Sequence, residues 1–281
     1  MKGRKSLYKT TLETTVFLLR GYIPVCDIVI GGDAMLTILS KIDALQERIN
    51  NTRPLGREEV DELKQYFKVG LTFSSNAIEG NSLTESETKV IIEDGLTIGG
   101  RPMKDLLEAV GHSQAFDYMW SLLKNKEITE RNIKSLHKLF FHAIDEKNAG
   151  KYRKRNVIIS GSQYNDTIPS PAELTKAMKD FVTDMSSKRQ ELHPVIFAAL
   201  IHKNFVFIHP FVDGNGRVAR LLMNLALIQA GYPITIIPPV LRPDYIQLLE
   251  KAHIDESEFS KFIAEQVLQT QRDYIRLLRI E

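Results

Sequence analysis

Apolar residues recur at helical spacing through most of the chain, and short runs of glycine, proline and polar residues separate them. Pro194 suits a first helical position, and the apolar pattern then continues to Ile208. Pro210 disfavours helical geometry at His209, so we expect this helix to end there. The pattern predicts helices over residues 34–50, 57–79, 103–124, 129–145, 172–188, 194–208, 216–230, 243–252 and 257–279.

One segment has extended character instead, between residues 150 and 170. A β-branched run at 157–159 precedes Ser160 and Gly161, and turn signals follow. This pattern predicts a small β-hairpin, so the expected fold class is all-α with one small β-hairpin. The expected organisation is an N-terminal helical region over 1–100, a helical core over 101–270 and the end of the last helix over 271–281.

Composition narrows the class of protein without naming an activity. The chain has 281 residues, 43% hydrophobic, which is enough for one or two domains. A net charge of +2 gives no sign of a nucleic-acid or membrane partner, and residues 151–155 form only a local basic cluster. The single cysteine, Cys26, excludes an intramolecular disulfide and indicates a reducing, cytoplasmic location. Residues 15–30 are apolar, but Arg20 and Asp27 interrupt them, so we expect no membrane span.

The most informative stretch covers residues 209–220 and reads HPFVDGNGRVAR. Residues 213–216 form a tight turn, because glycine and asparagine tolerate positive φ. A second helix begins directly afterwards, so the turn lies at a helix N-terminus, where backbone N–H groups and the helix dipole favour an anion. Arg217 and Arg220 are three residues apart and share the helical face beside that turn.

Each residue type in this stretch suits a nucleotide phosphate. The loop amides can hold phosphates, Asp213 can hold a divalent ion such as Mg²⁺, and the two arginines can neutralise the outer phosphates. His209 can take the proton from an attacking hydroxyl. A capped helix with a glycine turn and two solvated arginines would explain any one of these residues, but not the whole set at this spacing.

The stretch resembles the signature of the Fic family, HPFxDGNGRxxR, at every fixed position. Members of this family transfer the AMP part of ATP to a Ser, Thr or Tyr hydroxyl of a target protein and release pyrophosphate. The resemblance implies that His209 is the general base and that Asp213 is the Mg²⁺ ligand. It also implies an anion hole and phosphate-binding residues at Gly214, Asn215, Gly216, Arg217 and Arg220.

A second motif precedes this one, with Ser75 and Glu79 four residues apart on one helical face and Gly80 as a C-cap. Alone it fits an ordinary helix end with an exposed glutamate. Beside the signature it resembles the inhibitory pattern [S/T]xxxE[G/N], in which Glu79 would pair with Arg220 and misplace the γ-phosphate. Some members of this kind also remove AMP, so deAMPylation remains an open alternative.

The resemblance also assigns the segment over 150–170 to a flap above the active site. Its edge would pair with an extended segment of the target protein that presents the hydroxyl. The expected nucleotide contacts are Ile159, Ser160 and Gly161 in the flap and Tyr245 against the adenine. Where some members place an asparagine, this chain has His253. Many members form homodimers, so a homodimer also stays open.

Three alternatives to AMP transfer remain. They are another nucleotidyl or phospho-group transfer on the same scaffold, predominant deAMPylation, and a non-catalytic nucleotide-binding or interaction module. Gly216 and Arg220 favour the AMP orientation, and the presence of His209 and Asp213 argues against a module without activity. The other histidines lack metal-ligand spacing and are interpreted as structural or surface residues: His112, His137, His142 and His202.

Overall fold

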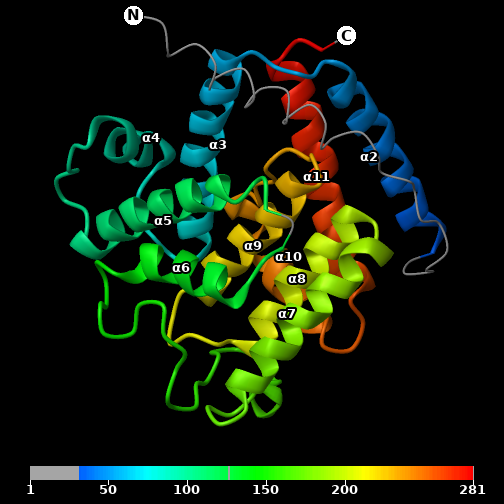
Figure 1. Cartoon of the computed structure of the whole chain (residues 1–281). Helices are drawn as coiled ribbons and strands as arrows, with labels where there is room; N and C mark the ends of the chain where they lie inside the picture. The colour runs from blue at the N-terminus through cyan, green and yellow to red at the C-terminus, as the bar shows by residue number, and fades with distance from the viewer. Residues whose placement is uncertain (1–31, 126, 281) are drawn as a thin grey trace, which may run out of the picture.

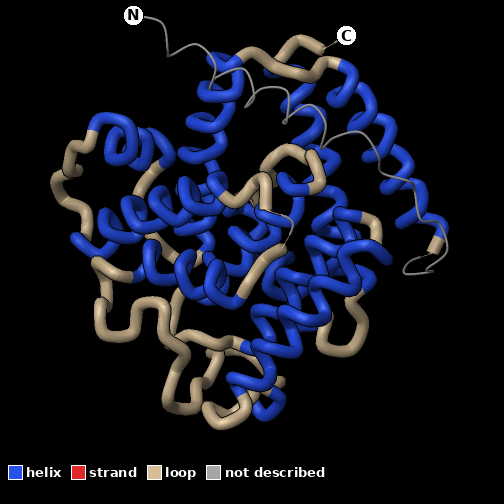
Figure 2. Tube along the Cα trace, in the orientation of Figure 1, coloured by secondary structure: helices blue, strands red, loops and turns tan. Residues whose placement is uncertain are grey.

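The structure, a computed structural model, describes residues 32–125 and 127–280. Within these ranges all regular elements are helices, as Figures 1 and 2 show. The predicted apolar stretch at 15–30 and Cys26 lie outside the described residues. The longer helices are α2 (Asp33–Asn51), α3 (Arg57–Ile78), α5 (Met103–Ser121), α6 (Glu130–Phe141), α7 (Leu174–Glu191), α8 (Pro194–Ile208), α9 (Asn215–Gln229), α10 (Arg242–Lys251) and α11 (Ser257–Leu277).

Helix α9 lies at the centre of the molecule and is buried along almost its whole length. It packs against α8, and α3, α5 and α6 also contact it. Its sequence is apolar nearly all round, as expected of a helix that other helices enclose. The polar residues at its N-terminal end are therefore carried into the interior on a rigid element.

Helices α2 and α11 pack against each other beside this centre (Figure 1). A buried glutamine pair joins them, with Gln271 donating to the Ile42 carbonyl oxygen at 3.1 Å and to Gln46 at 3.0 Å. Gln46 in turn donates to the Gly231 carbonyl oxygen just after α9, at 2.9 Å. One hydrophobic core runs from α2 to α11. The predicted division near residue 100 stays a prediction.

The predicted helices are present, with ends that differ by a few residues. Helix α8 ends as expected, with His209 as its C-cap. The segment between α3 and α5 contains α4 (Glu85–Lys89) and a π-helical turn, η1 (Val90–Asp94), neither of which was predicted. Thr84 caps α4 by accepting from the Glu87 N–H, while the Glu87 carboxylate accepts from the Thr84 N–H at 2.7 Å. This T-x-x-E capping box was a readable start signal.

The expected β-hairpin is absent from residues 150–170, which form turns and the short 3₁₀ helix η2 (Asn165–Thr167). The Asn165 side chain takes the place of a strand ladder. Its Oδ1 accepts from the Ile159 N–H at 2.6 Å, and its Nδ2 donates to the Ile159 and Ser162 carbonyl oxygens. At Ile159, the last residue of the β-branched run, a side chain therefore satisfies both backbone groups that a partner strand could pair.

The described helices include none that is both long enough and apolar enough to cross a membrane.

A 3₁₀ turn, η3 (Pro239–Leu241), leads into α10. Before it, Asn224 in α9 pairs with the backbone of Thr235, with N–O distances of 2.7 and 3.0 Å. This pairing fixes the chain that returns from the end of α9 across the core.

Candidate active site

His209 stands between α8 and the signature loop, with φ 49° and ψ 57°. Its Nδ1 lies 3.3 Å from the Val206 carbonyl oxygen, which can only accept, so Nδ1 carries the proton and Nε2 carries the lone pair. Burial lowers the pKa of His209 and the positive charge of Arg153 does the same, outweighing the Val206 hydrogen bond and nearby carboxylates. The ring is therefore neutral at pH 7 and able to accept a proton, as the predicted base requires.

The loop after His209 is held in shape by its own Asn215. Oδ1 of Asn215 accepts from the Phe211 N–H and Nδ2 donates to the Phe211 carbonyl oxygen, each at 2.9 Å. The Phe211 side chain is fully buried, as expected of a core anchor. The Asn215 side chain is thus committed to the loop itself. Its backbone N–H, at the first position of α9, is the part left for the predicted anion hole.

His137, on α6, supports the same loop from below. Its Nδ1 accepts from the Gly150 N–H at 2.9 Å, so its Nε2 carries the proton and donates to the Asp213 carbonyl oxygen at 3.0 Å. Its ring stacks on Phe211 with centroids 3.7 Å apart. Burial lowers the pKa of His137 to about 4, which keeps the ring neutral. The interpretation of His137 as structural fits this position.

The two loop glycines make room for groups from other elements. Gly214 has φ 79°, and a Cβ there would lie 2.8 Å from the Phe140 ring. A Cβ on Gly216 would collide with Oε1 of Glu79. Gly214 is also the N-cap of α9, so the N–H groups that begin α9 form the predicted anion site. The Glu79 carboxylate therefore lies directly against this site.

Arg220, on α9, is only 2% exposed and is held mainly by α3. Its Nη2 donates to Oε1 of Glu79 at 2.7 Å and to the Ser75 carbonyl oxygen at 2.9 Å, and its Nε donates to Ser75 Oγ at 2.9 Å. Burial alone would raise the pKa of Glu79, but the charge and hydrogen bond of Arg220, with the charges of Arg217 and Arg242, hold this pKa below its usual value. The expected pairing of Glu79 with Arg220 is present, and Gly80 follows with φ 92°.

Tyr245, on α10, lies on another edge of the Arg220 guanidinium. Its hydroxyl accepts from Arg220 Nη1 at 3.2 Å and lies 2.9 Å from Nε2 of His202. Burial lowers the pKa of His202 to about 3, so this ring is neutral. Tyr245 is 1% exposed, and in this conformation its ring packs in the core. The adenine contact predicted for Tyr245 stays a prediction.

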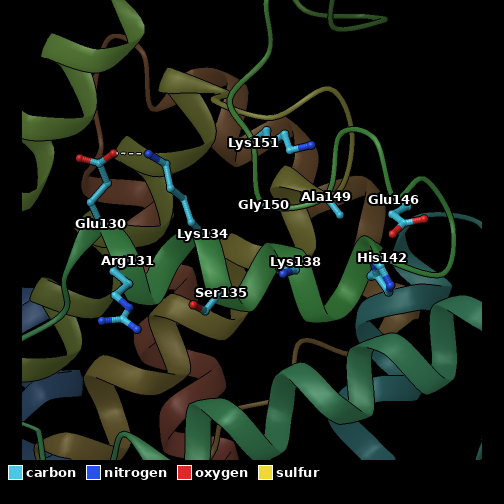
Figure 3. A pocket seen from close by; sticks show the side chains of 10 residues that line it. All are labelled: Glu130, Arg131, Lys134, Ser135, Lys138, His142, Glu146, Ala149, Gly150 and Lys151. Atoms are coloured by element: carbon cyan, nitrogen blue, oxygen red, sulfur yellow. Dashed lines mark hydrogen bonds and ion pairs between the residues drawn. The ribbon is translucent and has the colours of Figure 1, made fainter.

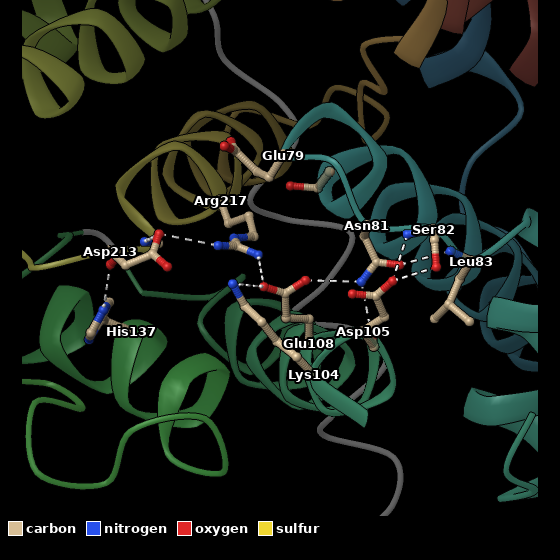
Figure 4. A network of polar contacts seen from close by, with 12 residues as sticks. Glu79, Asn81, Ser82, Leu83, Lys104, Asp105, Glu108, His137, Asp213 and Arg217 are labelled. Atoms are coloured by element: carbon tan, nitrogen blue, oxygen red, sulfur yellow. Dashed lines mark hydrogen bonds and ion pairs between the residues drawn. The ribbon is translucent and has the colours of Figure 1, made fainter. Parts of the chain in front are cut away.

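Arg217 lies between two carboxylates (Figure 4). Its Nη1 is 2.8 Å from Oε1 of Glu108, and its Nη2 is 3.4 Å from Oδ1 of Asp213. The side chains of Arg217 and Glu108 are 4% and 5% exposed, whereas that of Asp213 is 49% exposed. Sequence reasoning missed Glu108, because no local pattern links a residue of α5 to the distant signature.

Asp213 is the predicted metal ligand. Its Oδ1 accepts from the Gly214 N–H at 2.5 Å, and its half-exposed side chain lies beside the anion site. Mg²⁺ is commonly held by one or two carboxylates together with substrate phosphates. Among residues 32–125 and 127–280, no group of three or more His, Cys, Asp or Glu gathers to hold a metal. A single half-exposed carboxylate beside the predicted anion site fits a metal ion shared with a phosphate.

Arg153 ties the segment at 150–170 to the catalytic loop and was not predicted. It is 2% exposed, and its Nε donates to the His209 carbonyl oxygen at 2.8 Å. Its Nη1 donates to the Arg155 carbonyl oxygen at 3.1 Å, and its Nη2 donates to that of Pro169. The sequence places Arg153 in a local basic cluster. The buried guanidinium instead fixes the backbone of His209, the predicted base.

The predicted flap contacts lie at the tip of the same segment. Ile159 is partly buried, while Ser160 and Gly161 are exposed, and their contact with a nucleotide stays a prediction. Ser162 and Gln163 are hydrogen-bonded to the end of α10, where Glu250 accepts from Ser162 Oγ at 3.0 Å and from the Gln163 N–H at 2.7 Å.

His253 lies within an aromatic stack beside this tether. Its ring stacks on Tyr164 of the flap segment, with centroids 4.1 Å apart, and on Phe207 of α8, with centroids 3.6 Å apart. The interpretation of His253 as a packing residue fits this geometry in the present conformation.

A separate hollow lies on the outer side of α6 (Figure 3). Several cations line it, including Arg131, Lys138 and Lys151, and Lys134 pairs there with Glu130 at 2.5 Å. None of the signature residues lines this hollow. The candidate active site is therefore the polar cluster around the start of α9 and not this cavity.

Comparison with known proteins agrees with the geometry of the loop. Residues 127–227 match the Fic/DOC family, and this range includes α6, the flap segment, α8 and the signature at the start of α9. Residues 127–227 therefore form a Fic/DOC family domain. The match includes His209 and Arg220, while Glu79 lies before it.

Relatives of this Fic chain extend the similarity beyond that range. It is 39% identical over 235 residues to a protein from Nematostella vectensis named protein adenylyltransferase Fic, covering 81% of this chain and 53% of that one. It is 35% identical over 229 residues to a protein of the same name from Drosophila melanogaster, covering 80% of this chain and 45% of that one. The chain thus spans about half the length of the curated relatives it matches.

Solved structures show the same fold. Fic-1 (residues 134–508) from C. elegans superposes with a TM-score of 0.76 at 27% identity, covering 85% of this chain and 71% of that one. A Fic-domain-containing signalling protein from Bacteroides thetaiotaomicron superposes with a TM-score of 0.73 at 26% identity, covering 85% and 94%. The helical arrangement that places the signature at the start of α9 is therefore the Fic arrangement.

Proposed function

We propose that this chain is a protein adenylyltransferase that moves AMP from MgATP to a Ser, Thr or Tyr hydroxyl of a target protein. The observation that carries the proposal is the neutral His209, next in the chain to a preformed anion site that begins α9 and is flanked by two buried arginines. The adenylyltransferase names of relatives at 35–39% identity support the same activity.

His209 supplies the base in this proposal. With its Nδ1 proton directed at the Val206 carbonyl oxygen, Nε2 takes the proton of the target hydroxyl as the oxygen attacks the α-phosphorus of ATP. The bond from the α-phosphorus to the bridging oxygen breaks, and pyrophosphate leaves. Arg153 fixes the His209 backbone, so the base keeps its direction through the step.

The anion site and the arginines bind the nucleotide phosphates. The first N–H groups of α9 approach the α- and β-phosphates, and Arg217 and Arg220 neutralise the outer phosphates. Asp213 would hold Mg²⁺, which supplies charge neutralisation of the phosphates when bound. The target would present its hydroxyl in an extended stretch along residues 150–170, held in place by the backbone of that segment.

Glu79 would inhibit this reaction by occupying Arg220. The carboxylate is an anion at neutral pH, and it lies where a Cβ of Gly216 would also lie, against the start of α9. A γ-phosphate must therefore displace Glu79 to reach Arg220. While Glu79 stays, the triphosphate cannot align its α-phosphorus with the attacking hydroxyl.

Transfer from ATP labelled at the α-phosphate tests the proposal. We expect weak labelling of proteins by the unsubstituted chain, strong labelling by Glu79→Gly and loss of that labelling in Glu79→Gly/His209→Ala. If Glu79→Gly labels neither itself nor any protein of a lysate, AMP transfer is wrong. If labelling survives without His209, the assigned base is wrong.

Removal of AMP is a second candidate activity, favoured by the position of Glu79. Its carboxylate lies against the start of α9, where it pairs with Arg220, and from there it can also direct a water at an AMP-modified hydroxyl. We expect the unsubstituted chain to release AMP from a protein labelled beforehand by Glu79→Gly. Equal release by Glu79→Gly itself would contradict this second candidate.

A further inference from the structure

Glu108, on α5, joins the segment that carries Glu79 to the catalytic loop (Figure 4). Its Oε1 lies 2.8 Å from Arg217 Nη1, and its Oε2 accepts from Asn81 Nδ2 at 3.0 Å. Asn81 is the second residue after Glu79. One buried carboxylate therefore contacts both Asn81, which directly follows the predicted inhibitory motif, and an arginine of the signature.

The two neighbours contact Glu108 differently. Asn81 donates a hydrogen bond to Oε2, whereas Arg217 Nη1 meets Oε1 as an ion pair without hydrogen-bond alignment. Lys104 Nζ lies 3.6 Å from the same Oε1. The Asn81 amide cannot reverse, because its Oδ1 accepts from the Leu83 N–H at 3.0 Å and its Nδ2 also donates to the Asp105 carbonyl oxygen at 3.0 Å. Replacing Glu108 by glutamine would keep an acceptor for Asn81 but would remove the charge that faces Arg217.

Of the two carboxylates at Arg217, Glu108 is the nearer and the better shielded from solvent. Asp213 lies farther away, at 3.4 Å, and is half exposed. The Arg217 guanidinium carbon lies 4.4 Å from the centroid of the Phe140 ring, which closes another side. In this enclosed place the charge of Glu108 compensates the guanidinium before any phosphate arrives. It also keeps Arg217 from turning fully toward Asp213.

We propose that Glu108 is a positioning residue that directs Arg217 toward the nucleotide phosphates and keeps the Asp213 carboxylate available for the metal ion. Through Asn81 it connects this placement to the segment that carries Glu79. The inference rests on the proposed function, because it takes Arg217 to contact the phosphates of MgATP. Without the Glu108 charge, Arg217 closes on Asp213, and MgATP must break that contact in order to bind.

The test compares Glu108→Gln with Asp105→Asn, both in the Glu79→Gly chain. Asp105 is the matched control: it is a buried carboxylate one turn earlier on α5, and it accepts from the N–H and Oγ of Ser82 at 2.8 and 2.6 Å. We expect Glu108→Gln to raise the KM for MgATP by roughly tenfold with kcat nearly unchanged, because the lost contact serves binding. Asp105→Asn should leave this KM unchanged.

A double substitution separates positioning from folding. If Glu108 acts through Arg217, then Arg217→Gln and Glu108→Gln/Arg217→Gln should have the same KM for MgATP, because the second change removes nothing further. The paired variant carries no unpaired buried charge, and in Arg217→Gln the Glu108 carboxylate keeps Lys104 Nζ at 3.6 Å. This comparison therefore does not need a Glu108→Gln chain that folds on its own. A further rise in KM in the paired variant, or an equal effect of Asp105→Asn, overturns the proposal.

Calorimetric binding of MgATP keeps the two proposals distinguishable. If Glu79→Gly transfers no AMP, the proposed function fails, and the dissociation constant for MgATP replaces KM in the same comparisons. Weaker MgATP binding in Glu108→Gln than in Asp105→Asn then still supports the positioning role. Equal binding by these two variants overturns it whether or not AMP is transferred.

Discussion

Glu79 and Arg220 form a 2.7 Å ion pair, and the same guanidinium donates twice to Ser75, one turn earlier along α3. Tyr245 accepts from a third nitrogen of that guanidinium. The contacts with Ser75 and Tyr245 do not involve Glu79. Arg220 therefore keeps most of its partners when Glu79 is replaced, and one hydrogen-bonding position becomes open to a phosphate.

We expect Gly216→Ala to raise AMP transfer by the unsubstituted chain and not by Glu79→Gly. The added Cβ collides with Oε1 of Glu79, the end of a flexible side chain, so the carboxylate gives way. In the Glu79→Gly chain this collision is gone, and the methyl group only lies tightly against Arg220 Nη1, at 3.3 Å, and crowds the phosphate site. Initial rates of label transfer are compared for the unsubstituted chain, Gly216→Ala, Glu79→Gly and Glu79→Gly/Gly216→Ala. They show whether Gly216→Ala raises the rate in the first background and fails to raise it in the second. A fall in rate in both backgrounds contradicts the prediction.

The pH dependence of Glu79→Gly should show a basic group that titrates below pH 6.5, the ordinary value for histidine. Burial lowers the pKa of His209, so its neutral form is still present at pH 6.5 and is lost only as the pH falls further. Replacing Glu79 also removes one of the charges that raise this pKa. The profile of kcat/KM between about pH 5 and pH 9 reports the free enzyme. An acid limb centred at or above pH 6.5 would show that the base is not held neutral by burial.

Arg153→Lys should lower both stability and turnover. A lysine cannot reach the three carbonyl oxygens that Arg153 serves, including that of His209. We expect the free energy of unfolding in urea to fall by roughly 2–4 kcal/mol, and kcat in the Glu79→Gly chain to fall by about tenfold as the base loses its fixed direction. Arg155→Lys is the control, because Arg155 is exposed. Equal effects of the two changes would contradict the role given to Arg153.

His137→Phe should lower the free energy of unfolding by about 2 kcal/mol. The phenyl ring retains the stack on Phe211, but the Gly150 N–H and the Asp213 carbonyl oxygen both lose their partner. His142→Phe, at the exposed end of the same helix, should change it by no more than about 0.5 kcal/mol. Urea denaturation of both variants checks this, and an unchanged midpoint for His137→Phe would mean that the two hydrogen bonds contribute little.

The parts of the site that depend on local chemistry could be predicted from the sequence. Pro210 ends α8 at His209, and Gly214 begins α9, because these residues restrict or permit particular backbone angles. The pairing of Glu79 with Arg220 was available only through the resemblance to a known motif, since the two residues lie on different helices.

The parts that depend on contacts between distant segments could not be predicted. Arg153 resembles its basic neighbours in the sequence, and only the fold shows that it is buried on the His209 carbonyl oxygen. Glu108 lies on a helix with no motif of its own. The β-branched run before Ser160 indicates a strand, but Asn165 satisfies the same backbone groups with its side chain.

The two hydrogen bonds between the Asn215 side chain and the Phe211 backbone make the loop a preorganised receptor. The shape of the loop is set within these five residues and not by the group that binds there. In the proposed function, Glu79 then acts as an intramolecular ligand that competes with ATP for this loop. The end of α3 sets the effective concentration of the Glu79 carboxylate, and this concentration decides how strongly Glu79 competes. Loosening the helix end near Gly80 would lower that concentration without changing either carboxylate or guanidinium. If Glu79 inhibits as proposed, the degree of inhibition can thus be tuned at the end of α3 alone.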